Sequence, residues 1–161
     1  MTNVQRQEKS KEMMPGLQDM VMMETKFGSV MVNPAQQMEM QNGPIGFEAP
    51  QDYILTKIEQ DKKGIYLLLQ SIDEKDRAFI LLPIDPLSHG YEISDIVAAC
   101  NTLDIASENA RWFVIVNMNN AFGQPEIFAN FMAPIIMDMT AKKGWQHVFA
   151  NPHYEVKKKL L

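Results

Sequence analysis

Two apolar runs separated by a short polar stretch constrain the fold of this chain more than any other feature. The first run covers residues 65–71 and the second covers residues 78–84. Neither run alternates cleanly between apolar and polar residues, which is typical of strands that bury both faces inside a closed or covered sheet. Residues 73–77 between them are too polar to bury and suit a hairpin loop. The sequence therefore predicts a central antiparallel hairpin.

Short extended segments recur on both sides of this hairpin. Apolar or alternating stretches are found at residues 24–27, 30–32, 37–40, 52–59, 91–93, 112–116, 127–131, 135–139 and 145–149. Turn-forming residues separate them, and Gly28 with Ser29 is predicted to form the first turn. Pro134 cannot donate to a ladder, so it is expected at a bulge or an edge. Such closely spaced strands favour a small antiparallel barrel or sandwich.

Only one segment, at about residues 94–103, has a helical pattern. Ser94 is its expected N-cap, and Asp95 would lie near the positive end of the helix dipole. The apolar residues at positions 96, 97, 100 and 103 share one face, which we expect to lie on the sheet. The predicted fold class is mainly β: a compact, strongly bent antiparallel β-barrel-like domain with one short helix.

The domain organisation follows from the same patterns. Residues 1–22 are polar, lack an apolar period and are predicted to be a disordered or frayed N-terminal extension. Residues 23–156 are predicted to form a single β-barrel-like domain, for which a hydrophobic content of 46% is sufficient. Residues 157–161 are a basic tail that begins with three lysines.

Charge and composition exclude several classes of function. The chain has a formal net charge of −5, and residues 23–156 contain 17 acidic and 9 basic side chains. An acidic body repels phosphate backbones, so we expect no direct nucleic-acid binding, whereas a basic protein partner is compatible with it. Nothing in the sequence has the pattern of a secretory signal or a membrane span, and Cys100 has no second cysteine with which to form a disulfide. The expected location is the cytoplasm, away from membranes.

The residues that could carry chemistry do not form a catalytic or metal-binding pattern. His89, His147 and His153 have no ligand partners at metal-site spacing, and Cys100 has no histidine nearby in sequence. The acidic turn at residues 73–76 lacks the ordered ligand spacing of a calcium loop. We therefore expect no cofactor, no metal and no enzyme activity. The alternative is a small barrel that binds or turns over a small molecule, for which His89 or His147 would line a pocket.

Two segments are candidates for a partner-binding surface. Residues 43–47 form a turn-rich loop that carries Ile45 and Phe47, which either pin the loop to the core or contact a partner. Residues 129–136 contain Asn130, Phe131, Met132 and Pro134, where the proline would leave an edge with exposed apolar side chains. The alternative for Phe131 and Met132 is that they close the barrel end.

The order of several short motifs resembles that of the bacterial flagellar assembly factor family FliW. The stretches that carry the resemblance are residues 43–47, 69–71, 78–86, 91–93, 113–116, 129–136 and 143–144, spread over some 130 residues. This chain departs from the family in that Pro44 precedes Ile45 and that residues 87–90 lack the usual aromatic and acidic residues. The resemblance implies a β-barrel-like binding protein that binds flagellin in the cytoplasm. It also implies that the freed protein binds the translational repressor CsrA, so that flagellin mRNA is translated.

Overall fold

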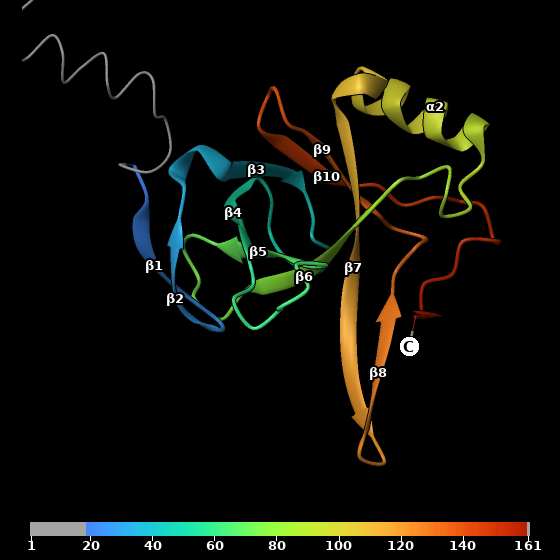
Figure 1. Cartoon of the computed structure of the whole chain (residues 1–161). Coiled ribbons are helices and arrows are strands. Elements are labelled where there is room, and N and C mark those ends of the chain that lie inside the picture. Colours follow the sequence, from blue (N-terminus) through green and yellow to red (C-terminus); the bar gives the residue numbers. More distant parts are fainter. Residues whose placement is uncertain (1–18, 161) are drawn as a thin grey trace, which may run out of the picture.

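The computed structural model describes residues 19–160, which form a mainly β structure with one α-helix among the described residues (Figure 1). The strands are β1 (Val21–Thr25), β2 (Gly28–Val32), β3 (Gln37–Asn42), β4 (Gln51–Lys57), β5 (Leu67–Ser71), β6 (Ala78–Ile84), β7 (Ala110–Ala121), β8 (Gln124–Ala129), β9 (Ile135–Asp138), β10 (Lys143–Gln146) and β11 (Lys158–Lys159). The helix is α2 (Ile93–Leu103), and two 3-10 turns are η1 (Pro34–Gln36) and η2 (Ser107–Asn109).

Seven strands close into a barrel. Their order is β7-β6-β5-β4-β3-β10-β9, and β9 returns to pair with β7. The predicted central hairpin is confirmed, because β5 and β6 pair antiparallel with Leu69 opposite Phe79. Among the described strands, the pairing of β10 with β3 is the only parallel one, with Lys143 opposite Glu39. The predicted mainly antiparallel, barrel-like fold class is therefore confirmed.

The barrel interior is filled by side chains. Its buried members are Met38, Met40, Tyr53, Leu55, Leu69, Leu81, Phe113, Ile135 and Met137. Both faces of the central hairpin are used, because the residues that alternate with these, such as Leu82 and Ile80, pack outside the barrel wall. The two-sided burial explains why neither run of the hairpin alternates in hydrophobicity.

A second core lies between the outer face of β7, the helix and the C-terminal segment. Its aromatic members are Tyr91, Trp112, Phe131, Phe149 and Tyr154. The Tyr91 ring centroid lies 4.7 Å from that of Tyr154 and 5.5 Å from that of Trp112. The helix contributes Ala99 and Cys100 to this core, as expected for an apolar face that lies on the sheet.

The helix begins one residue earlier than predicted, and its predicted cap is wrong. Glu92 is the N-cap and makes no side-chain capping bond, so Ser94 lies inside the first turn. The C-terminal segment anchors this end instead: the Glu92 N–H donates to the Tyr154 hydroxyl at 2.8 Å, and that hydroxyl donates to the Asp95 carboxylate at 2.6 Å. Residues 91–93 are not a strand, and Val97 is 52% exposed rather than on the buried face.

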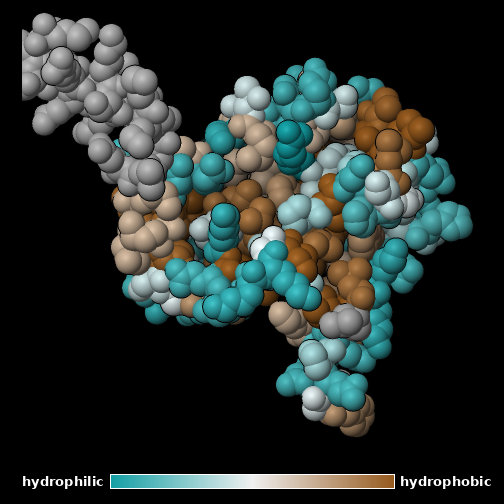
Figure 2. Space-filling model, in the orientation of Figure 1, coloured by the Kyte–Doolittle hydropathy of each residue, from teal (hydrophilic) through white to brown (hydrophobic). Residues whose placement is uncertain are grey.

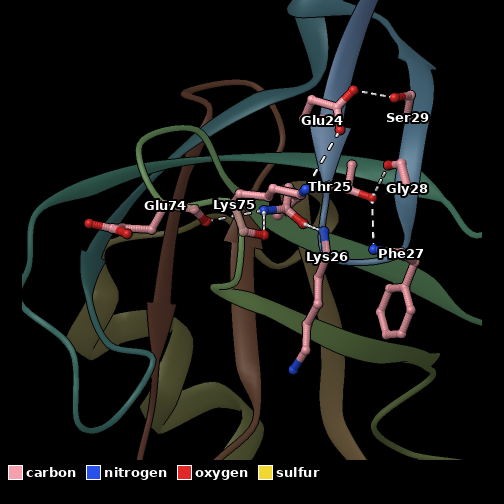
Figure 3. Close-up of polar contacts among 9 residues, drawn as sticks. Glu24, Thr25, Lys26, Phe27, Gly28, Ser29, Glu74 and Lys75 are labelled. Carbon is pink, nitrogen blue, oxygen red and sulfur yellow. Dashed lines mark hydrogen bonds and ion pairs between the residues drawn. The ribbon is translucent and has the colours of Figure 1, made fainter.

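The first hairpin turns at Lys26 and Phe27, not at Gly28 and Ser29 as predicted. The reason lies in Thr25, whose hydroxyl accepts the Phe27 N–H at 3.1 Å and donates to the Gly28 carbonyl at 2.6 Å (Figure 3). Gly28, with φ of 104°, then begins β2. The small β1–β2 sheet packs Val30 and Val32 against Ile54 of the barrel wall.

The element boundaries differ from the predicted domain limits at both ends. β1 begins at Val21, inside the segment assigned to the extension, and β11 lies in the segment assigned to the basic tail. The Leu160 N–H donates to the Ile127 carbonyl of β8 at 2.7 Å, which holds the chain end against β8. Residues 1–18, on which the predicted disorder mainly falls, lie outside the described residues.

β7 is much longer than the predicted strand at residues 112–116. It runs on through residues 117–121, three of which are asparagines, and forms with β8 a two-stranded ribbon that projects beyond the barrel (Figure 1). The three asparagines are exposed, because the barrel does not cover this part of the strand. The apolar pattern alone therefore located only the buried half of β7.

Candidate functional site

The loop at residues 43–50 is held in one conformation by the side chain of Gln146, which is 5% exposed. The Ile45 N–H donates to Gln146 Oε1 at 2.6 Å, while Gln146 Nε2 donates to the Ala133 carbonyl at 3.0 Å. The Gln146 N–H is itself bound to Asn42 Oδ1 at 2.8 Å. One amide thus joins the two segments that the sequence singled out, residues 43–47 and residues 129–136.

Gly43 is required by this arrangement. Its φ is 70°, in the left-handed region, and a Cβ atom there would lie 2.8 Å from Gln146 Cβ. Both the backbone angle and the close approach to Gln146 favour glycine. The peptide bonds before Pro44 and Pro50 are both cis.

The two large apolar side chains of the loop differ in their surroundings. Ile45 is 64% exposed and Phe47 is 41% exposed. The Phe47 ring packs edge-on against Phe79 with centroids 5.5 Å apart, and the Arg77 guanidinium lies 4.5 Å from the Phe47 centroid. Phe47 therefore both pins the loop and keeps part of its ring open to solvent, whereas Ile45 projects outward.

A third exposed apolar residue lies next to this loop, on the turn after β5. Ile72 is 41% exposed, and its N–H donates to the Asp52 carbonyl at 3.2 Å. Arg77, at the far end of the same turn, donates from Nη1 to Gln51 Oε1 at 2.5 Å. We call Ile45, Phe47 and Ile72 the loop patch. The carboxylates of Glu48, Asp52 and Asp73 belong to the same loop, strand and turn, so acidic groups accompany the apolar side chains.

The segment at residues 129–136 is not the exposed edge that the sequence predicted. Phe131 is 4% exposed and lies in the outer core, and Pro134 is also buried. The Phe131 carbonyl accepts from the Tyr91 hydroxyl at 2.5 Å, and its N–H donates to the Glu155 carbonyl at 2.8 Å. The proline leaves no open edge because residues from the C-terminal segment and the loop after β10 pair with this stretch.

Asn130 and Met132 remain partly accessible in the same segment. Asn130 Oδ1 accepts the Ala133 N–H at 3.1 Å, which closes a local turn, and the Met132 carbonyl accepts the Phe149 N–H at 2.8 Å. The prediction that Phe131 and Met132 expose their side chains at an edge is therefore wrong for Phe131 and holds only in part for Met132.

His89 and His147 each contact a residue close to them in sequence. His89 Nδ1 lies 2.8 Å from the Asp85 carbonyl, and the His147 ring packs edge-on against Phe149 at 4.7 Å. Burial lowers the pKa of His147 below its usual value, which keeps the ring neutral at pH 7. Within residues 19–160, no group of three or more His, Cys, Asp or Glu side chains is arranged to hold a metal ion.

Cys100 is buried against the outer core, and burial raises the pKa of its thiol. A raised pKa means less thiolate and lower reactivity.

Three hollows of the described surface lack the histidine lining on which the small-molecule alternative depends. Their volumes are about 400, 360 and 320 Å³. Neither His89 nor His147 lines any of these three. No helix among the described residues is long and apolar enough to cross a membrane.

Comparison with known proteins assigns this architecture to a family. The family model described as FliW protein matches residues 21–160. The flagellar assembly factor FliW of Anoxybacillus flavithermus is 32% identical over 142 residues, which cover 86% of this chain and 93% of that protein. The factor of the same name from Azoarcus sp. is 32% identical over 126 residues, covering 76% of this chain and 86% of that protein.

A solved structure agrees with the fold. A crystal structure of the flagellar assembly factor FliW superposes with a TM-score of 0.67 and covers 88% of this chain and 97% of that chain, at 22% sequence identity. At this identity the likeness shows the fold alone. The family match and the fold agree over the whole span from β1 to β11.

Proposed function

The chain belongs to the FliW family of flagellar assembly factors, and from this premise we propose that it binds flagellin and antagonises the translational repressor CsrA in the cytoplasm. In this proposal, export of flagellin frees the protein, which then binds CsrA and relieves repression of flagellin mRNA translation. The protein acts by binding and not by catalysis. The observation that carries the proposal is the family match over residues 21–160.

The charge of the chain supports a basic RNA-binding partner. The formal net charge is −5, and residues 23–156 hold nearly twice as many acidic as basic side chains. An acidic surface attracts a basic protein and repels the RNA that competes for it. An acidic antagonist therefore associates faster with a basic repressor and also repels the RNA that competes for it.

We propose that the loop patch, with Asn130 and Met132 on the linked segment, contacts a partner. Exposed apolar side chains next to carboxylates suit a partner that has an apolar anchor and basic residues around it. Phe131 and Pro134 support this segment from the buried side. Because both residues are buried, they support the proposed surface from below and do not themselves contact the partner.

The binding experiment uses purified flagellin and purified CsrA, each titrated against the full chain by isothermal calorimetry. Binding to CsrA is expected to weaken as salt rises, because screening reduces attraction between exposed charges. In a second assay, CsrA bound to a labelled flagellin mRNA leader is expected to release the RNA when the protein is added. Added flagellin should then restore the CsrA–RNA complex. The proposal requires both interactions, so failure to bind flagellin or failure to bind CsrA would contradict it.

Two matched isoleucines test the loop patch. Ile45 is 64% exposed and Ile93, on the helix, is 68% exposed, so Asp at either position is expected to leave the fold intact. Ile45→Asp is expected to weaken partner binding by at least about tenfold, the loss associated with roughly 1.4 kcal/mol at a contact residue. Ile93→Asp should leave it unchanged. Equal effects of the two substitutions would place the contact elsewhere.

A further inference from the structure

The ribbon formed by β7 and β8 leaves one strand edge open. The pairing of β7 with β6 starts at Val116 opposite Ile80, whereas the pairing of β7 with β8 continues to Ala121 opposite Gln124. Beyond Val116, β7 therefore has a partner on only one side among the described strands. Figure 1 shows this half of β7 extending past the barrel with β8 alone beside it.

The alternation of backbone groups identifies which residues face the open edge. The Ile115 carbonyl accepts the Asn130 N–H on the β8 side, so odd-numbered residues of β7 direct their N–H and C=O groups toward β8. Even-numbered residues direct theirs to the other side, where Val116 pairs with β6. Met118 and Asn120 therefore direct their backbone groups to the open edge.

The opposite edge of the same ribbon is closed. On β8 the Ile127 carbonyl faces outward, because it accepts the Leu160 N–H of the chain end at 2.7 Å. Pro125 has the same parity and lies just beyond the cover given by β11, so its missing N–H prevents further pairing there. The chain thus covers or blocks one edge of the ribbon and leaves the other available.

The open edge borders a depression in the body that is lined mostly by apolar side chains, together with Lys26 and Asp61. Two adjoining hollows of about 320 and 360 Å³ are both lined by Phe27, Ile80 and Met118. Phe27 is 42% exposed and Met118 is 59% exposed. Figure 2 shows hydrophobic residues on the body where the hydrophilic ribbon projects from it. Alternate side chains of a strand laid along the β7 edge would point into this depression, since Met118 has the parity of Val116 and faces the same side.

The charges around the open edge restrict the occupant, because the edge itself has none and the hollows beside it have one of each sign, Lys26 and Asp61. Residues 117–125 contain no charged side chain, although the chain as a whole is 22% charged. An uncharged strand edge accepts an uncharged segment without leaving a charge desolvated. A second copy of this chain is disfavoured, because each copy has a net charge of −5 and pairing would bring two acidic bodies together.

We propose that the β7 edge at Met118 and Asn120 binds an extended, uncharged segment of a partner protein as an added strand, with its alternate apolar side chains in the hollow beside Phe27 and Ile80. Backbone hydrogen bonds hold the segment, and the hollow selects for apolar side chains at every second position. None of the three loop-patch residues lines either hollow, so this surface is formed by other side chains than the loop patch.

The test uses a capped, fluorescently labelled heptapeptide of alternating threonine and valine as the probe, with binding followed by fluorescence anisotropy. The peptide is expected to bind the full chain saturably and to protect the amides of Met118 and Asn120 from hydrogen exchange. Two further peptides carry N-methyl groups on alternate amides. The peptide that is methylated on the amides facing β7 should lose at least about tenfold in affinity, whereas the peptide that is methylated on the other amides should bind as before.

Substitutions in the ribbon separate the edge from the rest of the surface. Asn120→Pro removes only the N–H that faces the open edge and is expected to weaken the probe by at least about tenfold. Met118→Lys puts a charge at the hollow and should weaken probe binding to a similar extent. It provides the test if the proline variant does not fold. The control Phe122→Ser changes a fully exposed residue at the ribbon tip and should leave affinity unchanged.

Three results obtained with the probe would each overturn the proposal. They are absence of saturable binding at millimolar probe, equal affinity for both N-methylated peptides, and unchanged affinity in a folded Asn120→Pro variant. A concentration-dependent dimer that Asn120→Pro dissociates would also overturn it, because a second copy would then occupy the edge.

Discussion

Replacing Gln70 by Leu is expected to lower the free energy of unfolding by about 2–3 kcal/mol. The Gln70 side chain is 0% exposed, and its Oε1 accepts the Lys26 N–H at 3.0 Å. Its Nε2 donates to the Lys75 carbonyl at 2.8 Å and to the Ser71 carbonyl at 3.1 Å. Nε2 also lies 3.3 Å from the Glu74 and Arg77 carbonyl oxygens, so its two hydrogens are shared among four acceptors. Counted by the two hydrogens and the one accepted N–H, Leu removes the equivalent of three hydrogen bonds, each contributing about 1 kcal/mol net. The turns regain some contact with water, which sets the lower end of the range.

The same amide joins two turns that are far apart in sequence. Figure 3 shows Lys26 in the first hairpin turn beside Glu74 and Lys75 in the turn after β5. The Lys75 ammonium adds an exposed ion pair to Glu24 at 3.8 Å, which contributes little by comparison. Loss of the amide is therefore expected to release the tip of the β1–β2 hairpin, with faster hydrogen exchange at the Lys26 amide.

The assay is urea unfolding followed by tryptophan fluorescence, analysed as a two-state transition. Gln37→Leu, at an exposed glutamine of β3, is the control and should change stability by less than about 0.5 kcal/mol. Gln70→Glu keeps the acceptor for Lys26 but places a carboxylate against carbonyl oxygens. Burial raises the pKa of such a group, so Gln70→Glu should be less destabilised at pH 5 than at pH 8. If Gln70→Leu and Gln37→Leu unfold at the same urea concentration, the account of this amide is wrong.

Three further perturbations can be measured by the same unfolding assay. Gly43→Ala should lower the free energy of unfolding by about 2–4 kcal/mol, and Gly64→Ala by only about 1–2 kcal/mol. Both glycines have a positive φ, but only at Gly43 would a Cβ atom also lie against a neighbouring side chain. Equal losses of stability would contradict the close approach. The hydrogen bond from Tyr154, followed by that from Asn151, lowers the pKa of Asp95, so its stabilising contribution is present above pH 4 and is lost as pH falls through the lowered value. The stability of the wild type should therefore fall relative to Asp95→Asn between pH 5 and pH 2, and parallel pH profiles would refute this. Phe131→Ala should lower the free energy of unfolding by about 3–5 kcal/mol and Phe47→Ala by about 1 kcal/mol, because the Phe131 side chain is 4% exposed and the Phe47 side chain is 41% exposed. The reverse order would mean that Phe47 is the structural residue.

The central hairpin could be predicted because its signal is local. Both arms and their turn lie within residues 65–84, and the lack of alternation correctly indicated burial on both faces. Barrel closure had no such local signal. The parallel pairing of β10 with β3 joins Lys143 to Glu39, and neither short strand has a pattern that specifies its partner.

The candidate site was predictable in part for the same reason. Ile45 and Phe47 lie on a turn-rich loop whose exposure follows from its composition. The burial of Phe131 depends on the C-terminal segment, through the Glu155 carbonyl and the Tyr91 hydroxyl, and no local pattern contains that information. The role of Gln146 was missed, since a polar residue in an alternating stretch normally faces solvent.

The open edge of β7 was missed because a strand that continues through polar residues has a weak sequence signal. The absence of charge over residues 117–125, next to an acidic domain, is the feature that could have indicated it. Pro125 on the adjacent strand was a second indication that one edge of this stretch is blocked.

The parallel closure between β3 and β10 has a consequence for biosynthesis. About 100 residues separate Glu39 from Lys143, so the first half of the barrel wall is made long before the strand that completes it. At about 5–20 residues per second, the ribosome needs roughly 5–20 s to add the intervening chain. During that interval β3 has β4 on one side and an unpaired edge on the other. The nascent protein therefore cannot seal its interior until β10 has been made, and a chain stalled before residue 143 would present that edge to aggregation or to a chaperone.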